Sequence, residues 1–287
     1  MRITAFVVVL GCAASAILLG WVYFRRYPIT RPPVGVFNRW DIAIMIGGIV
    51  LVPYLYLILP RWIVAGLLLI GVLSALYFMW EPVLRAAWAI WLVTITLAGA
   101  DIGTALVFGT TSTPFFVVNN VVLTLVIVGL TNLWAQSGMQ ARDVALLAGA
   151  LALYDFIATW QLSLTTDLFS RLIGFPFAPL VAWHADSSGR WLGIGLGDLL
   201  LAAVFPLVMR KAFARASGSA ALAISLAVIG AVLALPILGV VHATFPVMIV
   251  LGPLIVLQYI GWRRQRGAER TTWQYRQIEP HRERATT

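Results

Sequence analysis

Long apolar runs separated by short polar breaks dominate the chain. Between charged or turn-rich breaks we identify nine runs of about 18–22 residues, at positions 3–24, 41–60, 62–80, 84–104, 114–134, 142–162, 190–208, 219–240 and 244–261. A helix of that length covers the roughly 30 Å hydrocarbon core of a bilayer, because each residue advances it by about 1.5 Å. The pattern therefore predicts an all-α polytopic membrane protein with about nine transmembrane helices.

Composition indicates the same class of protein. Hydrophobic residues make up 61% of the 287 positions and charged residues 11%, whereas soluble domains carry about 25% charged residues. The single cysteine, Cys12, lies in an apolar run, which excludes a disulfide framework and a cysteine-based metal site. Nothing in the sequence indicates a metal ion or another cofactor.

The basic residues indicate how the chain crosses the membrane. The net charge of +9 comes from side chains that flank the apolar runs or gather in the tail, which is typical of topology signals rather than of nucleic-acid binding. With nine runs, the strongly basic connections fall on one side, and the opposite side holds few basic residues: Arg61, Arg171 and Arg190. We therefore expect the N-terminus outside, residues 1–261 as the membrane domain, and residues 262–287 as a solvated, basic cytosolic tail.

Three carboxylates, Asp101, Asp155 and Asp198, lie inside apolar runs. An ionised carboxylate in the bilayer interior costs several kcal/mol, so each needs a partner or a function. Asp155 is 13 residues into its run, about 20 Å from the cytosolic face, and Asp198 is 8 residues into a run that starts outside, at about 12 Å depth. In a core of roughly 30 Å, these two successive helices bring Asp155 and Asp198 to nearly the same level.

Small residues share a helix face with each of these two carboxylates, Ala152 and Ala158 on the first run and Gly195 and Ala202 on the second. They predict a close approach of the two helices. Two carboxylates within hydrogen-bonding reach share one proton, because ionising both is unfavourable. Such a pair can hydrolyse a bond, relay protons in a transporter, or merely hydrogen-bond neighbouring helices, and the residues alone leave all three readings open.

The other polar residues in apolar or outer segments have no motif around them. We expect Asp101 to make a polar contact or to be a helix-end residue, and Asn119 and Asn120 to hydrogen-bond between helices. His184 and His242 fall in outer connections, where roles in a loop or at the membrane interface are expected.

Two short motifs carry a resemblance to a known family. Tyr154-Asp155 in the sixth run and Gly195-Leu196-Gly197-Asp198 in the seventh resemble the YD and GxGD motifs of the presenilin and signal peptide peptidase family of intramembrane aspartyl proteases. The number of runs and the place of the motifs are also similar to that family. The resemblance implies a presenilin-like fold and an aspartic endopeptidase, with Asp155 and Asp198 as the catalytic pair and their motif neighbours, Tyr154, Gly195, Leu196 and Gly197, as supporting residues.

The family also has a PAL motif at the start of its ninth helix. The best match here is Pro246-Val247-Met248, which retains only the proline, and Leu235-Pro236-Ile237 is a rival if the last two runs are divided differently. Type 4 prepilin peptidases carry a GxGD aspartate too. They are the weaker match, because this chain has one cysteine and lacks the basic residue that usually follows their aspartate.

The expected orientation resembles that of the signal peptide peptidase branch. It implies transmembrane substrates whose N-terminus faces the cytosol, such as remnant signal peptides, with no nucleic acid or cofactor involved. The family pattern further implies that an extended substrate segment adds to strand-like backbone near residues 163–189 and Pro246. The alternative function is a proton-coupled transporter or channel that uses Asp155 and Asp198 as a relay.

Overall fold

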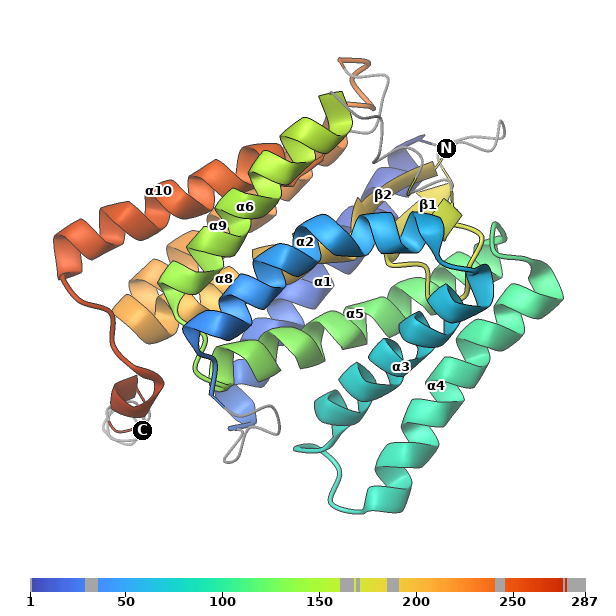
Figure 1. The fold of residues 1–287 in the computed structure, drawn as a ribbon, viewed down its shortest axis with the longest axis horizontal. Coiled ribbons are helices and arrows are strands. Elements are labelled where there is room, and N and C mark those ends of the chain that lie inside the picture. The colour runs from blue at the N-terminus through green and yellow to red at the C-terminus, as the bar shows by residue number, and fades with distance from the viewer. Residues whose placement is uncertain are drawn as a thin grey trace.

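The computed structural model describes residues 2–28, 36–160, 168, 171–184, 191–240, 246–275 and 277. Within these residues the chain forms nine helices of 18–25 residues and one two-stranded sheet (Figure 1). In chain order they are α1 (Arg2–Arg26), α2 (Arg39–Ile58), α3 (Arg61–Trp80), α4 (Ala87–Phe108), α5 (Thr113–Gln136), α6 (Ala141–Trp160), β1 (Leu180–His184), β2 (Trp191–Gly195), α8 (Leu196–Phe213), α9 (Arg215–Ala234) and α10 (Met248–Arg266).

Each apolar run identified in the sequence corresponds to one of these helices, and the chain is a largely helical, multi-pass membrane protein. In the part of the chain that the structure describes, six helices, α1 to α5 and α9, are long and apolar enough to cross a membrane. Large apolar side chains point outward from them; for example, Trp88 of α4 is 72% exposed and Ile44 of α2 is 71% exposed. Such surfaces suit contact with lipid tails rather than with water.

The seventh predicted run, 190–208, is not helical throughout. Its first part is β2, which pairs antiparallel with β1 from Leu180↔Gly195 to His184↔Trp191, and α8 begins only at Leu196. The two strands lie very close at Gly193, where a Cβ would be 3.0 Å from the Cβ of Ala182. The all-α prediction therefore missed a small sheet, and Asp198 lies in the first turn of a helix rather than two turns inside one.

Helix α5 passes through the middle of the molecule (Figure 1). It is the most buried of the six candidate spans within the described residues, and it packs against α1, α3, α4, α8 and β1. Its N-terminus is defined by Ser112, whose hydroxyl accepts a hydrogen bond from the N–H of Phe115 at 3.3 Å. A capping serine satisfies one of the N–H groups that the first turn of a helix leaves without a partner. The helix gives the strands a rigid surface.

Helix α6 packs closely along α10, and Figure 1 shows the two ribbons side by side. At their crossing, a Cβ on Gly252 of α10 would lie 2.7 Å from both the carbonyl oxygen of Ala148 and the Cβ of Ala152. The sequence analysis expected the small face of α6 at Ala152 to receive the helix of Asp198. That expectation was wrong for Ala152, because this face receives α10 instead.

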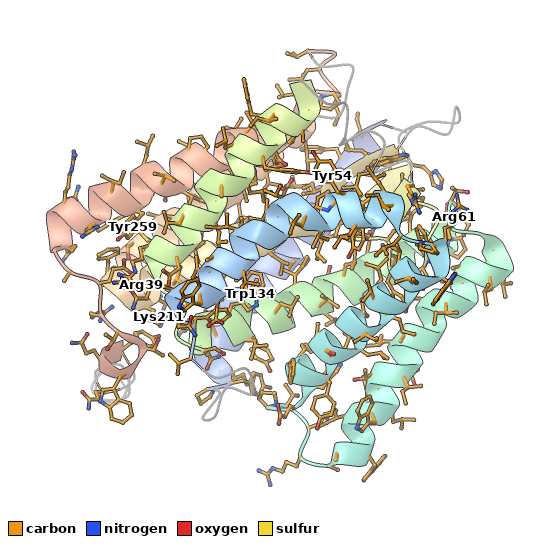
Figure 2. The ribbon with its side chains drawn as sticks, in the orientation of Figure 1. Arg39, Tyr54, Arg61, Trp134, Lys211 and Tyr259 are labelled. Atoms are coloured by element: carbon orange, nitrogen blue, oxygen red, sulfur yellow. The ribbon has the colours of Figure 1, made fainter. Side chains whose placement is uncertain are left out.

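Charged side chains gather at the two ends of the bundle. Figure 2 shows Arg39 and Lys211 near one end and Arg61 at the opposite end, as the basic residues predicted. Lys211 is only 1% exposed, and its Nζ donates to the carbonyl oxygens of Ala135, at 2.7 Å, and Met139, at 2.6 Å. The Ala135 carbonyl lies in the last turn of α5, where a helix lacks internal donors and carries partial negative charge, and the Met139 carbonyl lies in the turn that follows. Lys211 is therefore more than a topology signal, because it terminates a neighbouring helix.

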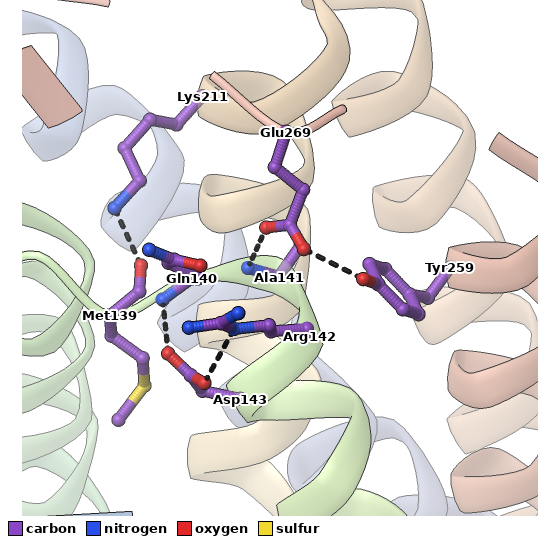
Figure 3. A network of polar contacts seen from close by, with 8 residues as sticks. All are labelled: Met139, Gln140, Ala141, Arg142, Asp143, Lys211, Tyr259 and Glu269. Carbon is purple, nitrogen blue, oxygen red and sulfur yellow. Dashed lines mark hydrogen bonds and ion pairs between the residues drawn. The ribbon is translucent and has the colours of Figure 1, made fainter. Parts of the chain in front are cut away.

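The chain beyond α10 folds back onto this end. The carboxylate of Glu269 accepts hydrogen bonds from the N–H of Ala141, at 2.9 Å, and from the hydroxyl of Tyr259, at 2.8 Å (Figure 3). Arg270 donates to backbone carbonyls at the end of α8. The boundary expected at residues 261/262 falls inside α10, and Glu269, Arg270 and Thr272 are bound to α6, α8 and α10 rather than fully solvated. The last ten residues, 278–287, lie outside the described part of the chain.

Replacing Lys211 with methionine should destabilise the protein. The substitution keeps most of the side-chain volume but leaves the carbonyl oxygens of Ala135 and Met139 buried without their donor. A loss of about 1–3 kcal/mol is expected for such groups, measured as a lower Tm in detergent. The exposed Arg264, changed to methionine in the same way, should leave Tm unchanged, and equal Tm values for the two variants would contradict this reading of Lys211.

Candidate functional site

A cavity of about 410 Å³ lies between α2, α6 and α8. Its lining side chains are mainly apolar: Met45, Ile49, Val52, Tyr56, Trp134, Leu147, Leu151, Leu168, Leu172, Pro179, Leu200 and Leu201. The cavity therefore favours an apolar occupant, held by a small number of polar groups.

Asp155 and Asp198 are the two carboxyl groups that line this cavity among the described residues. Asp155 is 9% exposed and lies in the last turns of α6, and Asp198 is half-buried in the first turn of α8. Their carboxylates are close enough to interact electrostatically. The structure thus brings together, in one apolar cavity, the two residues that the sequence analysis paired by depth.

Backbone N–H groups approach Asp198 from two helices. The N–H of Val247, which directly precedes α10, lies close enough to the Asp198 carboxylate to interact with it. Asp198 also lies in the first turn of its own helix, with Oδ2 on the side of Gly195, whose Cβ position is 3.9 Å away. The positive ends of the α8 and α10 dipoles therefore meet at one carboxylate, an arrangement that stabilises its negative charge.

The residues proposed from the motifs surround the pair. Tyr154, Gly195, Leu196 and Gly197 all line the cavity. Neither Pro246-Val247-Met248 nor Pro236 lines the cavity, but residues 246–248 are buried and the backbone of Val247 interacts with Asp198, whereas Pro236 lies in the turn after α9. The geometry therefore favours Pro246-Val247-Met248 over the rival segment as the element next to Asp198.

The outer wall of the cavity is α2, which the sequence analysis did not connect with the site. Met45, Ile49, Val52 and Tyr56 recur at helical spacing and face the cavity, although most of α2 is exposed. In sequence this stripe cannot be told from a lipid-facing one, because both are apolar. The guanidinium of Arg171 donates to the carbonyls of Leu57 and Leu59 at the end of α2, which fixes this wall to the segment before β1.

Asp101 makes the polar contact that was expected of it. It is fully buried in α4, and its Oδ2 accepts a hydrogen bond from the N–H of Phe177 at 2.7 Å. Phe177 has a φ of +57°, in the left-handed region that a side chain other than glycine's enters at a cost of about 1–2 kcal/mol. Asp101 therefore supports a strained residue just before β1 and lies outside the lining of the cavity.

Replacing Asp101 with asparagine and with leucine should separate hydrogen bonding from charge at this position. Asparagine keeps an oxygen acceptor for the N–H of Phe177, so Tm should stay close to that of the unmodified protein. Leucine leaves that N–H without its acceptor and should lower Tm, by an amount equivalent to about 1–3 kcal/mol. A large loss with asparagine would mean that the ionised carboxylate itself is needed.

The remaining polar candidates lie away from the cavity. Asn119 and Asn120 were expected to join helices, but they bind the backbone of the segment that contains β1. His184 is in β1, its ring edge-on to Phe116 with centroids 4.8 Å apart, and His242 lies outside the described residues. Among the described residues, no three or more His, Cys, Asp or Glu side chains gather as a metal site.

Comparison with known proteins does not assign the chain to a family. No protein-family model matches it, and no similar curated protein was found.

Proposed function

We propose that this protein is an intramembrane aspartyl endopeptidase of the presenilin and signal peptide peptidase kind. In this proposal all nine helices cross the bilayer, with the N-terminus outside and the C-terminus in the cytosol. The basic residues support that orientation, since Arg39 at the start of α2 and Lys211 near the end of α8 share one end of the bundle.

One observation carries the proposal: two carboxylates, one from α6 and one from α8, line the same cavity with apolar walls and are close enough to interact electrostatically. Asp155 and Asp198 come from α6 and α8, and each belongs to the motif that suggested its role. A structural pair would need only a mutual contact. It would not need an adjacent cavity of about 410 Å³ beside the carboxylates.

The chemistry follows from the charge environment of the pair. Asp198, with the N–H of Val247 and two helix N-termini around it, suits the ionised partner that takes a proton from water. Asp155 then carries the shared proton and gives it to the carbonyl oxygen or the leaving nitrogen of the peptide bond. The two groups titrate as a unit, so a pH–rate profile reports the pair rather than either residue.

The cavity and the nearby strands indicate the class of substrate. Apolar walls suit side chains of a transmembrane segment or a remnant signal peptide. Hydrolysis requires that segment to unwind locally, because a helix holds its peptide groups in internal hydrogen bonds. Backbone exposed by unwinding needs hydrogen-bond partners, since lipid supplies none. Extension of the β1–β2 sheet by a substrate strand meets that need and leads the strand toward Asp198, which follows β2 in the chain.

The test is cleavage by the purified protein in liposomes. A single apolar helix, labelled at both ends and inserted with its N-terminus on the cytosolic side, should be cut within its apolar stretch, as read by mass spectrometry. An analogue that carries a secondary alcohol in place of the scissile carbonyl should inhibit, because it mimics the tetrahedral intermediate. Proton flux across the liposomes without any cleavage would overturn the proposal in favour of a transporter.

A further inference from the structure

Three buried polar side chains on α4 and α5 bind successive backbone groups of one segment. The Nδ2 of Asn119 donates to the carbonyls of Ala178 and Leu180, each at 3.2 Å. Asn120 binds Ala182 twice: its Nδ2 donates to the carbonyl oxygen at 2.9 Å, and its Oδ1 accepts from the N–H at 3.0 Å. With Asp101 on Phe177, these contacts follow the segment from residue 177 to residue 182.

These bonds close the edge of β1 that faces away from β2. In an antiparallel pair, the N–H and C=O of one residue point to the same side, and alternate residues point to opposite sides. Both groups of Ala182 are taken by Asn120, so they face α5 rather than β2, and the carbonyl of Leu180 points the same way. The asparagines therefore supply the hydrogen bonds that a third strand would otherwise supply.

The segment held in this way determines where Asp198 lies. Leu180 pairs with Gly195 across the sheet, and the N–H of Leu196 donates to the carbonyl oxygen of Pro179 at 2.9 Å. Leu196 is the first residue of α8, and Asp198 follows it by two residues. Because β1 is hydrogen-bonded to β2 and to the start of α8, a displacement of β1 relative to α5 would also move the Asp198 carboxylate.

Burial and helix geometry support a specific role for this pair. Asn119 is 1% exposed and Asn120 is 2% exposed, so each amide is held where an unpaired polar group is costly. Adjacent helical residues point about 100° apart, so the two amides reach backbone groups that are separated along a neighbouring segment. Two asparagines in succession suit an extended segment that crosses α5, because such a segment has free backbone N–H and C=O groups along its length.

We propose that Asn119 and Asn120 are positioning residues that hold β1 on α5, and thereby set the place of Asp198 and the edge at which a substrate strand joins the sheet. Neither residue lines the cavity, so they act through β1 and β2. With the α5 side closed, a substrate strand adds on the β2 side. This inference rests on the proposed peptidase function, and its failure can be told apart from a failure of that function.

The test compares Asn120→Leu with Asn132→Leu, two substitutions on the same helix. Asn132 is also fully buried, but its Nδ2 binds the carbonyls of Gly20 in α1 and of Val128 in α5, so it joins helices only. Both variants should therefore lose stability. Only Asn120→Leu should spread cleavage over neighbouring peptide bonds and lower kcat by about 10- to 100-fold at nearly constant KM, because the reacting groups are misplaced.

Hydrogen–deuterium exchange provides a readout that does not need cleavage. Peptides covering residues 178–184 and 191–198 should exchange faster in Asn120→Leu than in the unmodified protein, and should be unchanged in Asn132→Leu. An inactive unmodified protein that shows this exchange pattern would refute the peptidase and leave the anchoring role of Asn120 in place. Unchanged exchange in Asn120→Leu, or the same single cut site in both variants, would overturn the positioning role.

Discussion

Replacing either Asp155 or Asp198 with asparagine is expected to reduce hydrolysis of a transmembrane reporter by about 100- to 10,000-fold, since acid–base catalysis by a positioned carboxylate is worth roughly 10²–10⁴. Asparagine has nearly the same size and keeps the walls of the cavity packed, so the loss should reflect chemistry rather than folding. The measurement is the initial rate of cleavage in liposomes, with Tm recorded for each variant to show that it is folded.

The double variant provides the control for this prediction. If the two carboxylates act as one unit, Asp155→Asn combined with Asp198→Asn should be no slower than either single change, because residues of a catalytic unit are strongly non-additive. Retention of more than a tenth of the activity in either single variant would refute the assignment. A double variant whose loss of activity equals the product of the two single losses would also refute it, since that result indicates two independent roles.

Replacing Gly252 with leucine should have the second-largest effect. A Cβ alone at this position would lie 2.7 Å from the Ala148 carbonyl oxygen, an atom of the α6 backbone that has little freedom to move, so α10 must shift away from α6. Val247, whose N–H interacts with Asp198, is five residues earlier in the chain and would move with α10. A misplacement of about 1 Å can cost 10²-fold in rate, and we expect a loss of that size together with a lower Tm.

The same substitution at Gly261 is the matched control. Gly261 is also in α10, but no atom lies within 4 Å of its Cβ position, so a leucine there has room. Gly261→Leu should keep both Tm and the cleavage rate within about twofold of the unmodified protein. Equal losses at the two positions would show that the effect comes from changing any glycine in α10, rather than from the contact between α6 and α10.

Much of the helical layout could be predicted from sequence, because a bilayer imposes a length on apolar segments. The pairing of Asp155 with Asp198 also followed from depth, although Asp198 was counted from a helix start that proved to be a strand. The depths of the two aspartates still agree when both are counted from the end of the bundle where α6 begins and α8 ends. Asp155 is 14 residues from Ala141 and Asp198 is 13 residues from Lys211, or about 20 Å along each helix.

The resemblance implied strand-like backbone near residues 163–189, where β1 lies, but strand β2 and the side chains that support the sheet could not be predicted. The physical reason differs in each case. Trp191–Gly195 is short and apolar, and periodicity cannot separate a short buried strand from a helix turn. Asn120 and Lys211 bind backbone groups, which every residue carries, so no complementary side chain in the sequence indicates their partners. The role of Val247 was equally hidden, since it acts through its own N–H.

The turn between α5 and α6 has a mechanical consequence for the pair of carboxylates. Lys211 joins α8 to one side of this turn and Glu269 joins the C-terminal segment to the other, so both aspartate-bearing helices are fastened at their far ends. The two carboxyl groups lie at similar distances from this turn along α6 and α8. A small displacement at the turn therefore changes the separation of Asp155 and Asp198. Proteolytic trimming just after Arg266 would remove Glu269 and loosen the turn between α5 and α6, about 20 Å from the two carboxyl groups.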